Sequence, residues 1–214
     1  MNLLQCRTPI RGSRAEQRRQ HLLETARKLF IANGFHGTGV AQIAAASGIK
    51  VGQLYRDFAS KEDIIAEIAR RDLCNFLNEQ GLEDAIARGD MAAIRAWIGS
   101  FVSYEDDLEG YRLIPEIMAE SGRNNRVAEA QLEIHDRVRN TIVKALTACA
   151  PGARHAAARE ELADLIATLG GGLCQWLVLE RRNGRDPRPL RERLSAIITR
   201  ELDALCAEGA SAAV

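Results

Sequence analysis

Apolar residues recur along this chain of 214 residues at the three- and four-residue intervals that are typical of amphipathic helices. The first stripe predicts a helix over residues 14–32, and Asn33-Gly34 would end it through a glycine cap. The members of this stripe are Leu22, Leu23, Ala26, Leu29 and Phe30.

Glycine, proline and capping residues divide the rest of the chain into further helices, about nine in all. Two short helices are predicted over residues 40–46 and 50–57, with Thr38 as the N-cap of the first one and Ser47-Gly48 between them. The remaining helices are expected over residues 60–78, from Asp90 to Val102, around 113–118, and over 127–148, 155–182 and 187–206.

Composition supports the same fold class. The chain has only five prolines and is rich in Ala, Leu, Arg and Glu, whereas runs of β-branched residues are few. We therefore expect an all-α protein in which a compact group of three N-terminal helices precedes a larger helical group.

Charge is distributed unevenly, although lysines and arginines together balance aspartates and glutamates at 29 each. Ten basic and three acidic residues lie between Met1 and Lys61, a balance of +7, so the remaining residues carry −7. A basic end on an acidic body indicates that the N-terminal part meets a polyanion.

The sequence gives no sign of a membrane protein, a secreted protein, a metal site or a catalytic site. No apolar run suggests a membrane span and no secretory pattern opens the chain, so we expect a cytoplasmic protein without a membrane partner. The five cysteines are scattered and are interpreted as reduced thiols. The four histidines lack metal-ligand spacing, and Glu116 and Glu120 have no nucleophile at a recognisable spacing, so we expect no metal, cofactor or catalytic residue.

The segment from Val40 to Phe58 has the pattern of a helix-turn-helix. Ala44 is small where the second helix crosses, and Gly48 can adopt the positive φ that a three-residue turn needs. Apolar residues such as Leu54 point inward, which leaves the polar residues of the second helix free to face a major groove of DNA.

In this segment the chain resembles the TetR family of bacterial transcriptional repressors. The resemblance runs from Gln20 to Ala66, about a quarter of the chain, and the spacing of the whole set is highly specific. The matching residues are Ala26-x-x-Leu29-Phe30-x-x-x-Gly34-Phe35, Thr38-x-Val40-x-x-Ile43-Ala44, Gly48-Ile49 and Gly52-x-Leu54-Tyr55-x-x-Phe58-x-Ser60-Lys61-Glu62.

The resemblance implies a helix-turn-helix DNA-binding domain over residues 1–59 and an effector-binding and dimerisation domain over 60–214. The Ala-rich composition after 208 predicts a disordered tail. It implies phosphate contacts from Thr38, Tyr55 and Lys61. Base recognition is expected from Gln53 and from Lys50 or Arg56, with Val51 in the same surface. Lys50 and Gln53 depart from the small residues usual in the family, and a solvated charged face is the alternative for the three cations.

The implied function is a ligand-responsive repressor that binds a palindromic operator as a homodimer. Effector binding would favour a conformation whose paired recognition helices no longer match successive major grooves. The alternatives are a helical-bundle enzyme and an architectural DNA-binding protein without an effector.

Aromatic residues indicate where an effector could bind. Trp97, Phe101 and Tyr104 fall at i, i+4 and i+7 on one helix face. Four residues from other helices could complete a mostly apolar cavity for a small, largely apolar or aromatic molecule, with ordinary core packing as the alternative. These residues are Tyr111, Met118, His135 and Trp176.

The last two helices, expected over 155–182 and 187–206, carry more apolar positions than a small core uses. We expect them to form a two-helix patch that a twofold axis turns into a four-helix interface, the alternative being that these residues are internal core. The expected interface residues include Leu162, Leu169, Leu173, Leu194 and Ile198.

Overall fold

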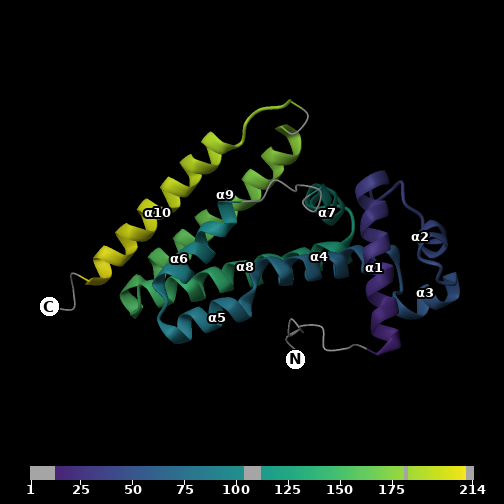
Figure 1. Cartoon of the computed structure of the whole chain (residues 1–214), viewed down its shortest axis with the longest axis horizontal. Helices are drawn as coiled ribbons and strands as arrows, with labels where there is room; N and C mark the ends of the chain where they lie inside the picture. The colour runs from purple at the N-terminus through teal and green to yellow at the C-terminus, as the bar shows by residue number, and fades with distance from the viewer. Residues whose placement is uncertain (1–12, 104–111, 181–182, 211–214) are drawn as a thin grey trace. The chain divides into compact units, whose positions relative to one another are not determined.

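The computed structural model describes residues 13–103, 112–180 and 183–210, the last three without their side chains. Within these ranges the chain is helical and has no strand, which confirms the all-α fold (Figure 1). The α-helices are α1 (Arg14–Asn33), α2 (Val40–Ser47), α3 (Val51–Asp57), α4 (Lys61–Leu77), α5 (Glu79–Arg88), α6 (Met91–Gly99), α7 (Leu113–Ser121), α8 (Asn125–Cys149), α9 (Ala156–Glu180) and α10 (Arg188–Ala210). Short 3₁₀ turns occupy Ser100–Val102 (η1) and Ala153–His155 (η3).

The chain divides into two compact units. The first spans Met1–Phe76 and Arg112–Ile134, and the second spans Leu77–Tyr111 and His135–Val214. The first unit therefore contains α1 to α3 and α7, nearly all of α4 and the beginning of α8.

One hydrophobic core holds the first unit together. It is built around Phe30, Ile43, Leu54 and Ile64, all of which are fully or almost fully buried. Leu113 and Ile117 of α7 and Val127 of α8 belong to the same cluster. The helix-turn-helix thus shares its core with helices that come much later in the chain.

Local signals in the sequence explain several helix ends. Gly48 ends α2 in the left-handed conformation, with φ 66°. Ser60 accepts a hydrogen bond from the amide of Asp63 at 3.1 Å, and Asp90 accepts one from Ala93 at 3.0 Å. These caps satisfy amides that the first turn of a helix leaves free, as expected from the sequence.

The second unit is built from α5, α6, α9, α10 and the larger part of α8. Its buried residues include Ile94, Ile142, Ile166 and Leu202. The stretch Ala153–Glu180 is long and apolar enough to cross a membrane by length and composition alone, but a core helix of a soluble protein passes the same test. Because α9 supplies many of the buried side chains of this unit, we interpret it as a core helix.

Three expectations were wrong. Gly39 and not Thr38 precedes α2 as its N-cap, and no side chain caps that helix. Helix α5 was not expected, because it follows Asn78, which has φ 41° and makes no capping hydrogen bond from its side chain. Cys74 is disulfide-bonded in the structure, whereas Cys149, Cys174 and Cys206 are free thiols.

Candidate nucleic-acid interface

Helix α3 is anchored by its inner face and exposes its outer face. Leu54 is completely buried and Phe58 nearly so, while the amide of Ile49 donates to Ala44 O at 3.1 Å and closes the turn before α3. On the outer face Val51 is 42% exposed and Tyr55 51% exposed.

The charged residues expected at this surface are also accessible. Lys50 precedes α3 as its N-cap residue and Arg56 lies in its last turn, and both side chains are exposed. A helix that presents a tyrosine, two cations and a small apolar residue to solvent has the chemistry to contact phosphates and base edges.

The turn between α1 and α2 is fixed by hydrogen bonds within the protein. The hydroxyl of Thr38 is completely buried and shares its single proton between Gly34 O at 2.9 Å and Leu29 O at 3.2 Å. The ammonium of Lys61 donates to Phe35 O at 2.8 Å and Thr38 O at 3.1 Å. In this conformation the Thr38 hydroxyl cannot reach a phosphate, so its expected role is corrected to a structural one.

Lys61 also has a structural role. Its Nζ lies 4.2 Å from the centroid of the Phe35 ring, a cation–π contact that adds to the two hydrogen bonds. An ammonium has three N–H groups, so a phosphate contact would use the one that the two carbonyls leave over.

Two arginines of α1 also hold the end of helix α3, through hydrogen bonds to Asp57. Arg18 of α1 donates to the Asp57 carboxylate from Nε at 3.2 Å and from Nη2 at 3.3 Å. Arg19 donates to the Asp57 carbonyl at 3.1 Å and lies 4.3 Å over the ring of Phe58. The bonds from Arg18 hold the pKa of Asp57 below its usual range, so the carboxylate is ionised at neutral pH.

Helix α7 contacts the same unit through two glutamates whose role the sequence did not reveal. Glu116 accepts the amide of Phe35 at 3.0 Å, and the buried Glu120 lies 3.1 Å from Nε2 of His36. Phe35 and Glu116 are 81 positions apart in the chain, so no local pattern could have connected them. The contacts link α7 to the turn that precedes the helix-turn-helix.

Comparison with known families assigns both parts of the chain. Residues 22–68 match the model of bacterial regulatory proteins of the tetR family. Residues 91–207, more than half of the chain, match the model of the C-terminal region of BetI-type transcriptional repressors. The chain belongs to the TetR family.

Relatives of this TetR-family regulator are themselves described as regulators. It is 34% identical over 120 residues to the transcriptional regulator UidR of Escherichia coli, covering 53% of this chain and 57% of UidR. It is 30% identical over 133 residues to the transcriptional activator FasR of Mycolicibacterium smegmatis, covering 60% of this chain and 57% of FasR. In both cases the match spans less than two thirds of the relative.

A solved structure shares the fold at lower identity. The transcriptional regulator FadR from Bacillus subtilis, solved in complex with stearoyl-CoA, aligns with a TM-score of 0.61 and 17% identity. The alignment covers 87% of this chain and 97% of FadR. At this identity the likeness shows the TetR fold alone.

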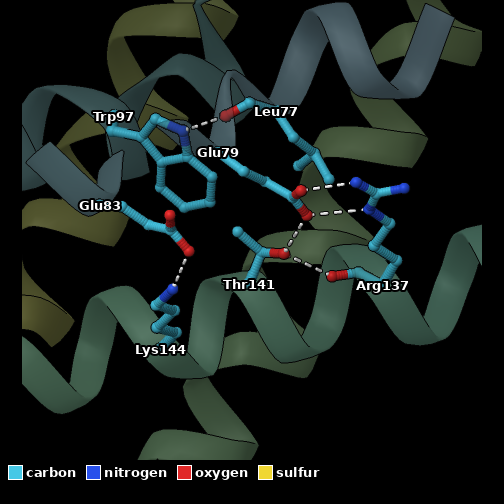
Figure 2. Close-up of polar contacts among 7 residues, drawn as sticks. All are labelled: Leu77, Glu79, Glu83, Trp97, Arg137, Thr141 and Lys144. Atoms are coloured by element: carbon cyan, nitrogen blue, oxygen red, sulfur yellow. Dashed lines mark hydrogen bonds and ion pairs between the residues drawn. The ribbon is translucent and has the colours of Figure 1, made fainter. Parts of the chain in front are cut away.

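The TetR-family regulator brings only part of the expected effector site together. The rings of Trp97 and Phe101 meet edge to face at 5.1 Å between centroids, and Phe101 is buried. The indole N–H of Trp97 donates to Leu77 O at 2.6 Å, beside the polar contacts of Glu79 and Glu83 (Figure 2). The Trp97 indole therefore holds the end of α4, a role that the aromatic spacing did not indicate.

The other expected effector residues are placed differently. Met118 belongs to the first unit and is 44% exposed, and the side chain of His135 is exposed, so neither lines an enclosed cavity in this structure. Trp176 is partly buried in α9. Tyr104 and Tyr111 lie outside the described residues.

The second unit has an open groove of about 740 Å³ between η1 and α10. It is lined by Val102 and Ser103 and by α10 residues that include Thr199 and Asp203, and none of the expected effector residues lines it. Within the part of the chain that the structure describes, no group of three or more His, Cys, Asp or Glu residues is placed to hold a metal ion.

The expected dimer residues divide into two groups. Leu162, Leu173 and Ile198 are buried within the single chain and therefore belong to its core, which corrects their expected role. Leu169 and Leu194 are partly exposed and remain candidates for an interface.

Proposed function

We propose that this TetR-family regulator is a cytoplasmic, ligand-responsive repressor that binds a palindromic operator as a homodimer. The observation that carries the proposal is the outer face of α3, where Val51, Tyr55 and Arg56 are exposed on a helix anchored by Leu54. In a helix-turn-helix the second helix enters the major groove, and a twofold dimer presents two such helices to two half-sites.

The contacts divide by chemistry. The hydroxyl of Tyr55 suits a phosphate. The exposed cations Lys50 and Arg56 suit phosphates or guanine, and the amide of Gln53 suits a base edge. Phosphate contacts set the position of the protein on any duplex, and base contacts select the sequence.

Release of DNA would follow from the shared core of the first unit. The α7 glutamates bind the turn before α2, and α7 and α8 side chains pack into the core of the helix-turn-helix. An effector that binds one arrangement of α7 and α8 better than another would therefore shift the population of α3 orientations.

We expect the effector to be a small, largely apolar or aromatic molecule. The Trp97–Phe101 pair in the second unit supports an apolar contact surface. The complex of FadR with stearoyl-CoA, a property of that protein, supports the idea that the same fold accommodates a ligand with a long apolar part.

Selection from a randomised duplex library tests DNA binding. The enriched sequences are expected to contain an inverted repeat, and fluorescence anisotropy should show affinity that falls steeply with salt, because bound cations release counterions from DNA. A reporter gene placed behind the selected site should be silenced by the protein. A set of selected sequences without a common site would refute the proposal, and activation of the reporter would refute repression.

A further inference from the structure

Helix α3 is short and is held in the core near one point. It spans Val51–Asp57, and Leu54 is the residue of this helix that is buried. Phe58, directly after the helix, is also buried. Because apolar burial is not directional, these two side chains contribute less to the orientation of α3 than a directional contact would.

A directional contact is made at the C-terminal end of α3. Nε of Arg18 donates to Oδ2 of Asp57 at 3.2 Å, and Nη2 donates to Oδ1 at 3.3 Å, so each carboxylate oxygen accepts one bond from α1. Arg19 donates to the Asp57 carbonyl at 3.1 Å and restrains the backbone of the same residue. A two-bond fork between arginine and a carboxylate fixes orientation as well as distance.

The Asp57 carboxylate also matters through its charge. The hydrogen bonds from Arg18 hold the pKa of Asp57 below its usual range, so the group is ionised at neutral pH. Helix α3 has seven residues and is therefore about 10 Å long, which is roughly the Debye length at physiological salt. An unpaired carboxylate on a helix that enters a groove of DNA would be repelled by the phosphates, whereas the pair with Arg18 has no net charge.

The alternative role for Arg18 is a direct contact with DNA. Its guanidinium has five N–H groups, and the fork to Asp57 uses two of them. The two roles differ in one requirement: positioning by Arg18 depends on the Asp57 carboxylate, whereas a phosphate contact does not.

We propose that Arg18 is a positioning residue for DNA recognition, which acts through Asp57 by fixing the orientation of α3 and by cancelling the negative charge of this helix. The inference rests on the proposed function, since it concerns the same helix. It assigns one of the cations of the basic N-terminal part to a contact within the protein and not to DNA.

Arg18→Gln, Asp57→Asn and the double variant form a cycle that separates the two roles of Arg18. Fluorescence anisotropy measures the affinity of each protein for the operator that the wild type selects. Arg18→Gln should weaken binding roughly five- to tenfold in the wild-type background but about twofold or less in the Asp57→Asn background, because the pair acts as a unit. Equal losses in the two backgrounds would show that Arg18 acts on DNA directly and would overturn the inference.

The salt dependence of the double variant gives a second measurement. This variant loses one positive and one negative charge, so its net charge equals that of the wild type. The slope of log affinity against log salt should be unchanged, because an arginine paired with Asp57 releases no counterion from DNA. A slope smaller by about one would show a phosphate contact from Arg18 and overturn the inference.

An unrelated duplex separates positioning from stability. Base edges require one orientation of α3, whereas phosphates carry no sequence information, so Arg18→Gln should lower the affinity for the unrelated duplex only about twofold. Arg27→Gln is the matched control, because Arg27 pairs with Asp72 at 2.9 Å and joins α1 to α4 in the same unit. The control should keep the wild-type ratio of the two affinities.

The remaining outcomes distinguish this inference from the proposed function. If Arg18→Gln lowered both affinities by the same factor, a loss of folded protein would explain the result and the inference would be overturned. An operator affinity unchanged by Arg18→Gln would also overturn it and leave DNA binding intact. Failure of the wild-type protein to select any sequence would overturn the proposed function and the inference together.

Discussion

Tyr55 shows how one side chain can be tested for a role in DNA binding without changing the fold. The residue is 51% exposed, so little packing depends on its ring. Tyr55→Phe keeps the ring and removes the hydroxyl expected to meet a phosphate, and it should weaken binding to every duplex alike, by roughly three- to tenfold.

Anisotropy with the selected operator and with an unrelated duplex would measure both affinities. Thermal unfolding of Tyr55→Phe should match the wild type. A loss confined to the selected operator would mean that Tyr55 recognises a base, contrary to this expectation.

Glu79 offers a residue-scale prediction about pH. Arg137 donates to its carboxylate at 2.9 and 2.5 Å, and these bonds hold the pKa of Glu79 below its usual range (Figure 2). A carboxyl group whose pKa is lowered by folding stabilises the native state above its unfolded pKa of about 4.3, and the stabilisation disappears as pH falls through the folded pKa.

Glu79→Gln should therefore lower the free energy of unfolding by roughly 1–2 kcal/mol at pH 7, with a smaller difference towards pH 4. Urea unfolding at several pH values measures this difference. Glu83→Gln is the control, because Glu83 and its partner Lys144 are both half exposed and should contribute only about 0.5 kcal/mol. An equal effect of the two substitutions would contradict the importance assigned to the Arg137 pair.

At the scale of elements, helices with strong periodicity and ordinary caps could be predicted from the sequence. The first helix was expected over 14–32 and spans Arg14–Asn33, and Asp90 caps α6 as expected. The sequence did not predict helix α5. Its N-cap residue, Asn78, has φ 41° and makes no capping hydrogen bond from its side chain, and no short-range pattern indicates such a helix start.

The candidate site was predictable only where it depends on local sequence. The outward face of α3 follows from the spacing of its buried residues, and Tyr55 and Arg56 are exposed as that spacing requires. The interior role of Thr38 depends on how the turn after α1 folds back on the carbonyls of Gly34 and Leu29. The contact of Glu116 with Phe35 joins residues that are 81 positions apart. Such partners are fixed by tertiary packing, so a single sequence could not reveal them.

The break between α4 and α5 gives a prediction at the element scale. Trp97 donates to Leu77 O at 2.6 Å, a carbonyl at the end of α4 that the next turn cannot satisfy. Trp97→Phe keeps an aromatic ring against Phe101 but removes the donor, and it should lower the free energy of unfolding by about 1–2 kcal/mol. Urea unfolding followed by circular dichroism would measure this loss.

Trp176→Phe is the matched control for Trp97→Phe, because it removes the other indole from the same unit and keeps the hydrogen bond from Trp97 to Leu77 O. Trp176→Phe should lower the free energy of unfolding by less than Trp97→Phe does. If Trp97→Phe is as stable as the wild type, the hydrogen bond contributes nothing and the ring acts by packing alone.

On the scale of the whole molecule, α9 presents a surface that the single chain does not use. Leu165 and Leu179, the latter 70% exposed, lie on one side of the helix, and residues 165–179 carry no charge. A Cβ added at Gly171 or Gly172 would meet no atom within 4 Å, although glycine inside a helix costs about 1 kcal/mol relative to alanine. Packing within the chain therefore does not explain these glycines.

A second copy of the chain would explain both features, since an uncharged strip with small residues lets two helices approach closely and a twofold axis buries the strip against itself. Leu179→Arg should therefore convert a homodimer into a monomer at micromolar concentration, as measured by sedimentation against the 23.5 kDa of one chain. Its affinity for the operator should fall by more than tenfold, because the two half-sites would then be bound independently.

Leu132→Arg is the matched control for the dimer prediction. Leu132 is 64% exposed on α8, so the same substitution adds the same charge at a similarly accessible leucine on a different helix. The control should sediment, bind DNA and unfold like the wild type. Leu179→Arg should keep the helical circular dichroism spectrum of the wild type because Leu179 is not in the core, but its unfolding temperature should fall as the stabilisation by the second subunit is lost. If Leu179→Arg remains a dimer, or if both variants dissociate alike, α9 is not the interface and its glycines need another explanation.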